Sequence, residues 1–558
     1  MIVLAAAALA AASCSSGPAG LSEEERRAAS AYGSFLAARY AGSARAADDA
    51  ARLYADAMAA EPGSAVISQN AFYSALMAGD FVRAREAAIA ALETEDADQR
   101  LPTLYLAADA LAGGRGDYEP GEAGEGGPFS DTVRDILTDW LAVERGEARA
   151  VAERLDAFPL SGGAFATYWE IHKGLVFEAA GRDADAEAAL RRAHQVLDLK
   201  AFTALTLGAF LERQGERGEA RAVYEAVLEA GGGAPEVADA LARVERRGRA
   251  PRRPGPTEAA AHAVFAPAAV FAARAPDDYA ALYLRLVQRL DPAFDRNTYL
   301  LATVLERLRL ADAASGAFAS IEDGALVEPA MIDRAWLLFR NGDPQAGEML
   351  AREALERFDS DSARLLLADM RRVTGRCAEA ASIYAEVRER RLEAGLRPDW
   401  RHAFYEGVCR QTTGEWASAE ALFLRALEIA PDEPRVLNHL GYNWIVLNRN
   451  IERGFEMVER AAEIEPENGA IIDSLGWGHF KQGRYEEAVR LLERATELSP
   501  YDPTINWHLG DAYARVGRER EARFQWRRAL ELDPDAREER LLEARLEGGL
   551  DAAPADLE

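Results

Sequence analysis

The sequence is poor in cysteine and has fewer basic than acidic residues, and each shortage excludes a class of protein. Its 558 residues include three cysteines, too few for a disulfide framework, and no Cys-x-x-Cys pair has the spacing of a structural zinc site. Lys and Arg number 65 against 93 Asp and Glu, and the formal charge of −28 repels the phosphates of nucleic acids. We therefore expect no nucleic-acid partner.

The chain also lacks the motifs of the common enzyme classes. It has no His-Glu-x-x-His, no Gly-x-Ser-x-Gly, no Walker loop and no Rossmann fingerprint. The seven histidines fall at different offsets, so they do not define a metal site. We predict a protein that is not an enzyme and holds neither metal nor cofactor. The alternative is an active site hidden in the irregular residues 112–165 or 248–275, which lack a paired nucleophile and base.

The first residues have the pattern of an export signal. Residues 2–12 (IVLAAAALAAA) form an apolar run of eleven, too short to span a bilayer and typical of a signal-peptide core. Small residues lead to Cys14 and a polar tether follows, so residues 1–20 resemble a bacterial lipoprotein signal. The resemblance implies acylation of Cys14, and Ser15 after it implies a lipid anchor on the periplasmic face of the outer membrane. The alternative is an Ala-rich helix that caps the fold.

A period of 34 residues governs the C-terminal third of the chain. Small, large and proline positions all recur at this spacing, and the repeat is weaker toward the N-terminus. The positions expected to pack one helix on another are Gly441, Gly476, Gly510, Ala488, Ala522, Trp526, Ala495, Ala529, Pro500 and Pro534.

This pattern resembles the tetratricopeptide repeat, a pair of antiparallel helices. Such helices approach closely only where a small residue lies at the crossing, so we expect Gly510 and Ala522 to accommodate Trp526. Proline cannot continue a helix, so Pro500 and Pro534 are expected to follow the second helices. The predicted fold is all-α, a right-handed α-solenoid superhelix of about twelve repeats, each touching mainly its neighbours.

The predicted domain organisation follows the interruptions of the period. Residues 21–247 form an N-terminal solenoid with a Gly-rich insertion at 112–128. The Pro/Arg-rich segment 248–257 is predicted to be a linker before a second solenoid at 258–547, and 548–558 is a tail.

The first helix of each repeat lines the concave face of such a solenoid, where partners bind. These helices combine aromatic and hydrogen-bonding side chains, as interaction surfaces do, although Trp477 and Trp507 are equally compatible with packing between repeats. The predicted protein-binding residues are Asn438, Tyr442, Asp473, Trp477, Trp507, Asp511 and Arg515. Cys377 and Cys409 lie in adjacent repeats as two free thiols or as a bridge.

A closer resemblance covers residues 437–530. The strings LNHLGY at 437–442, IDSLGW at 472–477, HLGDAY at 508–513 and RFQW at 523–526 resemble the LbcA-like family of proteobacterial envelope lipoproteins, which includes the adaptor of the carboxy-terminal processing protease CtpA. The resemblance implies a non-catalytic scaffold that binds a periplasmic processing protease and its substrates, the peptidoglycan (cell-wall) hydrolases. The alternative is an assembly factor for pilus, secretin or outer-membrane protein complexes.

Overall fold

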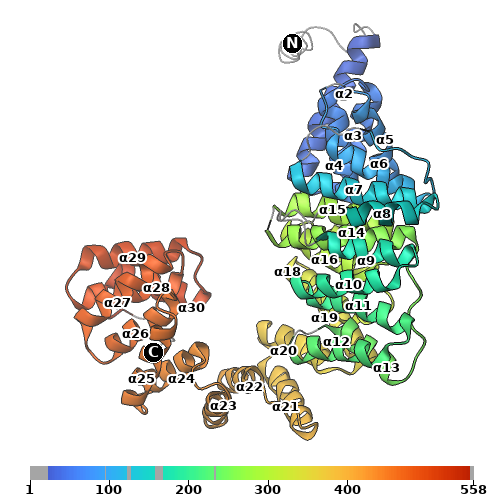
Figure 1. The fold of residues 1–558 in the computed structure, drawn as a ribbon. Coiled ribbons are helices and arrows are strands. Elements are labelled where there is room, and N and C mark those ends of the chain that lie inside the picture. The colour runs from blue at the N-terminus through green and yellow to red at the C-terminus, as the bar shows by residue number, and fades with distance from the viewer. Residues whose placement is uncertain are drawn as a thin grey trace. The chain divides into compact units, whose positions relative to one another are not determined.

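The computed structural model describes residues 23–94, 96–121, 127–157, 168–231, 234–274 and 276–552 (Figure 1). These residues form 29 helices and no strand, which confirms the prediction of an all-α solenoid. The predicted signal, Cys14 and the last residues of the tail lie outside the described ranges. The chain divides into two compact units, residues 1–358 and 359–558.

The first unit is built mainly of helical hairpins. Its helices are α2 (Glu23–Ser43), α3 (Ala47–Ala60), α4 (Ala65–Ala78), α5 (Phe81–Leu92), α6 (Arg100–Ala112), α7 (Gly127–Glu144), α8 (Ala148–Ala157), α9 (Trp169–Ala179), α10 (Asp183–Val196), α11 (Lys200–Gln214), α12 (Arg217–Glu229), α13 (Pro235–Glu245), α14 (Pro256–Arg274), α15 (Asp277–Leu290), α16 (Asp295–Arg307), α17 (Ala311–Ala319), α18 (Val327–Arg340) and α19 (Pro344–Phe358).

Helices α14 and α15 pack against helices that end more than seventy residues before them in the chain. Helix α14 contacts α7 and α9, and α15 contacts α4 and α6 (Figure 1). The guanidinium of Arg285 donates to the carbonyl oxygen of Met77 at 3.0 Å, and Arg289 pairs with Asp109 at 2.9 Å. Helix α14 is apolar all round and mostly buried, as a helix enclosed by others must be. The expectation that each repeat touches mainly its neighbours is therefore wrong for this unit.

The Pro/Arg-rich segment 248–257 lies inside the first unit, between α13 and the start of α14. Hydrogen bonds from arginine side chains to backbone carbonyl oxygens fix this segment in place. Arg217 donates to the carbonyl oxygen of Gly248 at 2.9 Å, and Arg253 donates to that of Glu178 at 3.2 Å. The division between the two units instead follows Phe358.

The second unit is a regular array of hairpins closed by a single helix. Its helices are α20 (Asp361–Val373), α21 (Cys377–Glu393), α22 (Trp400–Thr412), α23 (Trp416–Ile429), α24 (Pro434–Val446), α25 (Ile451–Ile464), α26 (Gly469–Lys481), α27 (Tyr485–Leu498), α28 (Pro503–Arg515), α29 (Glu519–Glu531) and α30 (Ala536–Gly548). From α22 to α28 the first helices of successive hairpins begin 34 or 35 residues apart. This is the period read from the sequence.

Small residues lie at the helix crossings of the second unit. A Cβ atom on Gly510 would lie 2.5 Å from Cδ1 of Trp526, and one on Gly476 would lie 2.8 Å from Cγ of Leu492. A Cβ on Gly441 would meet backbone, the carbonyl oxygen of Gly454, at 2.6 Å. The alanines at the corresponding crossings are fully buried: Ala488, Ala495, Ala522 and Ala529. Pro500 and Pro534 lie in the turns after α27 and α29.

Among the described residues, no helix combines the length and apolar character needed to cross a bilayer.

Candidate protein-interaction sites

The seven predicted binding residues lie on three successive first helices of the second unit, α24, α26 and α28. Their exposure differs greatly. Asp473, Trp477 and Asp511 are buried, while Asn438, Tyr442 and Trp507 are half-buried and Arg515 is exposed. The structure therefore separates this set into a packed group and an accessible group.

Asp511 is the centre of a buried polar cluster. Its carboxylate is inaccessible to solvent and accepts two hydrogen bonds from Arg545 on α30, at 2.7 and 2.8 Å. The indole N–H groups of Trp526 and Trp507 donate to the same carboxylate at 2.9 and 3.0 Å. Burial raises the pKa of Asp511, an effect that Arg545 opposes. Four donors occupy this carboxylate, so it packs α28 against α29 and α30 and has no capacity for a partner.

Trp477 is likewise buried by the packing of one repeat on the next. It is 5% exposed and stacks on His508 of the next repeat at a centroid distance of 3.9 Å and on Phe480 at 4.4 Å. His508 Nδ1 lies 2.9 Å from a carboxylate oxygen of Asp473, which orients the ring. Trp477 and Asp473 are therefore packed between repeats and offer little surface to a partner.

The accessible group defines the remaining candidate surface of the second unit. Tyr442 stands on α24, and burial together with the charge of Asp473 raises its pKa to about 12, so the phenol stays protonated. Trp507 is half-buried and Arg515 pairs with the exposed Asp551 at 2.9 Å. Together with the half-buried Asn438, they form a surface of partly accessible aromatic and polar residues.

The two described cysteines are free thiols, and both are buried. Cys377 begins α21 and Cys409 lies in α22, where they share one apolar cluster with Tyr384. Burial, and secondarily its neighbour Cys377, raise the pKa of Cys409 to about 12. A thiol of this kind is unreactive at neutral pH.

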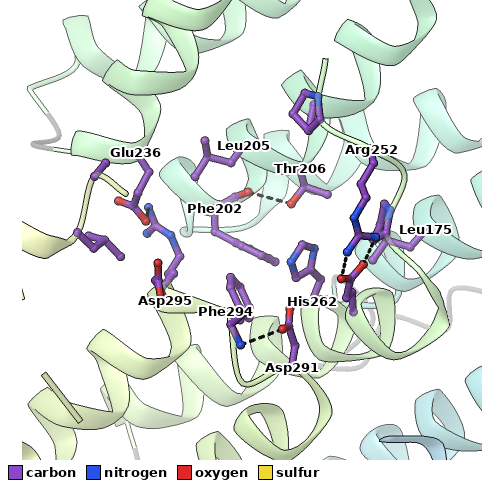
Figure 2. A pocket seen from close by; sticks show the side chains of 18 of the residues that line it. Leu175, Phe202, Leu205, Thr206, Glu236, Arg252, His262, Asp291, Phe294 and Asp295 are labelled. Atoms are coloured by element: carbon purple, nitrogen blue, oxygen red, sulfur yellow. Dashed lines mark hydrogen bonds and ion pairs between the residues drawn. The ribbon is translucent and has the colours of Figure 1, made fainter. Parts of the chain in front are cut away.

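The first unit contains a cavity of about 470 Å³ (Figure 2). Its walls come from α9, α11, α13, α14, the start of α16 and the segment that precedes α14. Phe202, His262 and Phe294 form an aromatic wall, with centroid distances of 4.6 Å between His262 and Phe294 and 6.3 Å between the two phenylalanines. Leu205 adds aliphatic surface to it. A volume of this size is in the range of sites for small ligands or for individual peptide side chains.

The arginines that line the cavity already have carboxylate partners. Arg296 pairs with Glu236 at 2.8 Å, and Arg252 donates to Glu258 at 2.6 Å. The third, Arg213, forms two hydrogen bonds to Glu178, at 2.7 and 2.9 Å. Each of these cations is therefore neutralised by one acid.

Two further carboxylates of the lining, Asp291 and Asp295, form no ion pair with Lys or Arg within the part of the chain that the structure describes, although the charge of Arg252 acts on Asp291. They stand on either side of Phe294 (Figure 2). Asp291 accepts a hydrogen bond from the backbone N–H of Ala293 at 3.1 Å. Burial raises the pKa of both carboxyl groups, and the charge of Asp291 raises that of Asp295 further. Burial also lowers the pKa of His262 to about 4, so its ring is neutral and supplies no positive charge.

Sequence reasoning missed this cavity. Its residues are spread over helices of low repeat quality, and the segment 248–257 was interpreted as a linker. One signal was available, because residues 259–272 are apolar on every side and a helix of that kind must be enclosed. The enclosing helices, and hence the partners of Asp291 and Phe294, follow only from the tertiary structure.

No group of three or more metal-ligating side chains occurs in the described ranges.

Comparison with known proteins identifies repeats in part of the chain. A family model described as tetratricopeptide repeat matches residues 332–392 and 374–434, and one described as TPR repeat matches residues 479–517. A curated relative, the TPR repeat-containing protein PA4667 of Pseudomonas aeruginosa, is 33% identical over 60 residues, which are 11% of this chain and 10% of the relative. The chain thus spans about a tenth of the length of that relative.

Several solved structures resemble the chain at low sequence identity. MamA from strain AMB-1 is 24% identical, covering 30% of this chain and 97% of its own, with a TM-score of 0.26. A chain of the APC/C hetero-tetramer Cut9-Hcn1 is 13% identical, and the match covers 95% of this chain and 97% of that one, with a TM-score of 0.39. YrrB, described as a TPR protein with an unusual peptide-binding site, is 17% identical, and the match covers 34% of this chain and 95% of YrrB, with a TM-score of 0.26. From the family models and the 34-residue helical hairpins, the chain contains tetratricopeptide repeats in residues 332–434 and 479–517.

Proposed function

We propose that this protein is a non-catalytic interaction scaffold of the bacterial envelope, anchored to the periplasmic face of the outer membrane. In this role it binds a carboxy-terminal processing protease and brings it peptidoglycan hydrolases as substrates. The observation that carries the proposal is the regular repeat array of the second unit, which contains the motifs at 437–526 that resemble the LbcA-like adaptors. Tetratricopeptide repeats act through protein contacts made along their helical surfaces.

The accessible residues of α24 and α28 are the proposed contact surface for the protease. Arg515 and Trp507 lie on the first helix of their repeat, the side from which such arrays bind partners. An exposed residue on the second helix of the same repeat, Phe524, is 64% accessible and serves as a matched control position.

Photocrosslinking in living cells tests this proposal. A photoreactive residue at position 515, followed by mass spectrometry of the adduct, is expected to capture a carboxy-terminal processing protease, and the same residue at position 524 is not. Adducts at position 515 that contain only pilus, secretin or outer-membrane protein subunits would refute the protease role and favour an assembly factor.

The lipid anchor has its own test. Labelled palmitate is expected to enter the wild-type chain and not the Cys14→Ala variant, because the proposed acylation occurs on that cysteine. Several acyl chains hold a protein on a membrane stably, at about 0.8 kcal/mol per buried methylene. Equal labelling of both proteins would contradict the anchor and leave the protease proposal standing.

A further inference from the structure

We propose that the cavity of the first unit is a binding site for a peptide that presents a lysine or arginine side chain beside an apolar residue. The proposal goes beyond the adaptor role, because it concerns the first unit and holds whichever protein the second unit binds. It depends on two features of the cavity, its unmatched negative charge and its aromatic wall.

The first feature is an excess of acidic over basic side chains in the lining, with two carboxylates outside any ion pair. The three lining arginines pair with Glu236, Glu258 and Glu178, at distances between 2.6 and 2.9 Å. Asp291 and Asp295 form no ion pair in the described parts of the chain, although the charge of Arg252 acts on Asp291, and both are half-buried. The charge of Asp291 acts unfavourably on Asp295 in this partly desolvated hollow, and a cation beside either carboxylate offsets that repulsion. The cavity is therefore complementary to a positively charged group.

The second feature is the aromatic wall against which such a cation would lie. Phe294 separates the two carboxylates, and Phe202 and Leu205 extend the apolar surface away from them (Figure 2). A cation over an aromatic face is attracted to the ring, and the methylene stem of a lysine or arginine packs on the same surface. The volume of about 470 Å³ exceeds what one such side chain fills, which leaves room for an apolar neighbour.

The geometry also distinguishes a peptide from a free amine. A small amine would satisfy the carboxylates and leave the surface of Phe202 and Leu205 uncovered. A peptide with a leucine next to its lysine covers both parts of the cavity, and apolar burial adds to its affinity. We therefore expect the peptide to bind at least tenfold more tightly than butylamine.

The test uses the full-length chain carrying Cys14→Ser and fluorescence anisotropy with labelled peptides. The probe is acetyl-Gly-Leu-Lys-Leu-Gly-amide, and the control peptide has norleucine in place of lysine, which keeps the length and removes the charge. We expect the lysine peptide to bind about tenfold or more tightly than the norleucine peptide, and added salt to reduce this difference.

Isosteric variants identify the site. Asp291→Asn and Asp295→Asn are each expected to weaken the lysine peptide about fivefold, and the double variant about twentyfold, with no loss for the norleucine peptide. Asp183→Asn on α10, an exposed acid outside the cavity, is the control and leaves both affinities unchanged. The melting temperature of the double variant is expected to equal or exceed that of the wild type, since the change removes a repulsion. This measurement separates lost binding from lost folding.

Four results would overturn the proposal. They are failure of the lysine peptide to bind at millimolar concentration, equal affinity for the two peptides, wild-type affinity in the double variant, and competition by butylamine as effective as that by unlabelled peptide. The last result would assign the cavity to free amines.

Discussion

The packing of the helical hairpins predicts opposite effects for two glycine-to-alanine changes in one repeat. Gly208 on α11 faces Tyr224 on α12, and a Cβ at position 208 would overlap the ring and hydroxyl of that tyrosine. Gly218, near the start of α12, has no atom within 4 Å of where its Cβ would lie. Alanine at both positions improves helix propensity, so the two variants differ only in what the new methyl group meets.

The magnitude for Gly208→Ala follows from what holds Tyr224 in place. The ring is fully buried, and its hydroxyl donates to Glu212 at 2.9 Å, while Arg243 pairs with the same carboxylate at 2.7 Å. Overpacking costs about 1–3 kcal/mol. Displacing the phenol from a buried carboxylate costs about 1.5–3 kcal/mol more. The propensity gain of up to about 1 kcal/mol offsets part of this, so we expect a net loss of about 1.5–5 kcal/mol.

Urea unfolding followed by far-ultraviolet circular dichroism measures this difference. Gly208→Ala is expected to lower the midpoint for the first unit, while Gly218→Ala leaves it unchanged or raises it slightly. Gly208→Ala combined with Tyr224→Leu makes room for the methyl group, so the double change is expected to cost less than the sum of the single changes. Stability of Gly208→Ala at or above the wild-type level would refute the reasoning.

Three further predictions concern the second unit. Asp511→Asn leaves the mostly buried Arg545 without its counter-ion, and we expect it to lower the free energy of unfolding in urea by about 3 kcal/mol. The control Asp551→Asn, at an 83% exposed carboxylate, is expected to change that free energy by less than about 0.5 kcal/mol. Similar losses for the two variants would contradict the structural role of Asp511. Burial lowers the pKa of His439 to about 4 in the folded state, so the unfolded chain binds a proton first and the free energy of unfolding falls by about 1–3 kcal/mol as the pH drops from about 6.5 to 4. His439→Gln is expected to flatten this part of the plot of stability against pH. A plot like that of the wild type would contradict the buried, neutral state of His439. Both described thiols are buried, and the pKa of Cys409 is raised to about 12, so neither thiol is expected to react with Ellman's reagent at pH 7.5 until urea unfolds the protein. Rapid labelling of the native chain would show that the thiols are accessible.

The sequence predicts the second unit well because its spacing encodes steric contacts. A glycine or alanine every 34 residues marks a close crossing of helices, and Gly510 against Trp526 is such a crossing. The contact depends on residues in one hairpin, so a local pattern suffices to find it. The same holds for the prolines in the turns after α27 and α29.

The sequence does not distinguish binding from packing on the first helices. Trp477 and Trp507 occupy neighbouring repeats and share a residue type, yet the structure buries the first and leaves the second half-exposed. The difference depends on which atoms the next repeat supplies, here the ring of His508 that covers Trp477. Periodicity reports the face of a helix and not what covers that face.

The two units use their inward polar residues in different ways, and this difference decides where a ligand fits. In the second unit, Asp511 pairs with Arg545 on α30, and Asp473 contacts His508 in the next hairpin, each about one repeat length further along the chain. These carboxylates therefore already have partners within the repeat array. In the first unit, α14 departs from the repeat register and fills the space between earlier hairpins. Asp291, in the turn between α15 and α16, and Asp295, at the start of α16, form no ion pair with the arginines that neutralise their neighbours. A regular repeat pairs its own polar groups, whereas the break in the repeat leaves two carboxylates for a partner to pair.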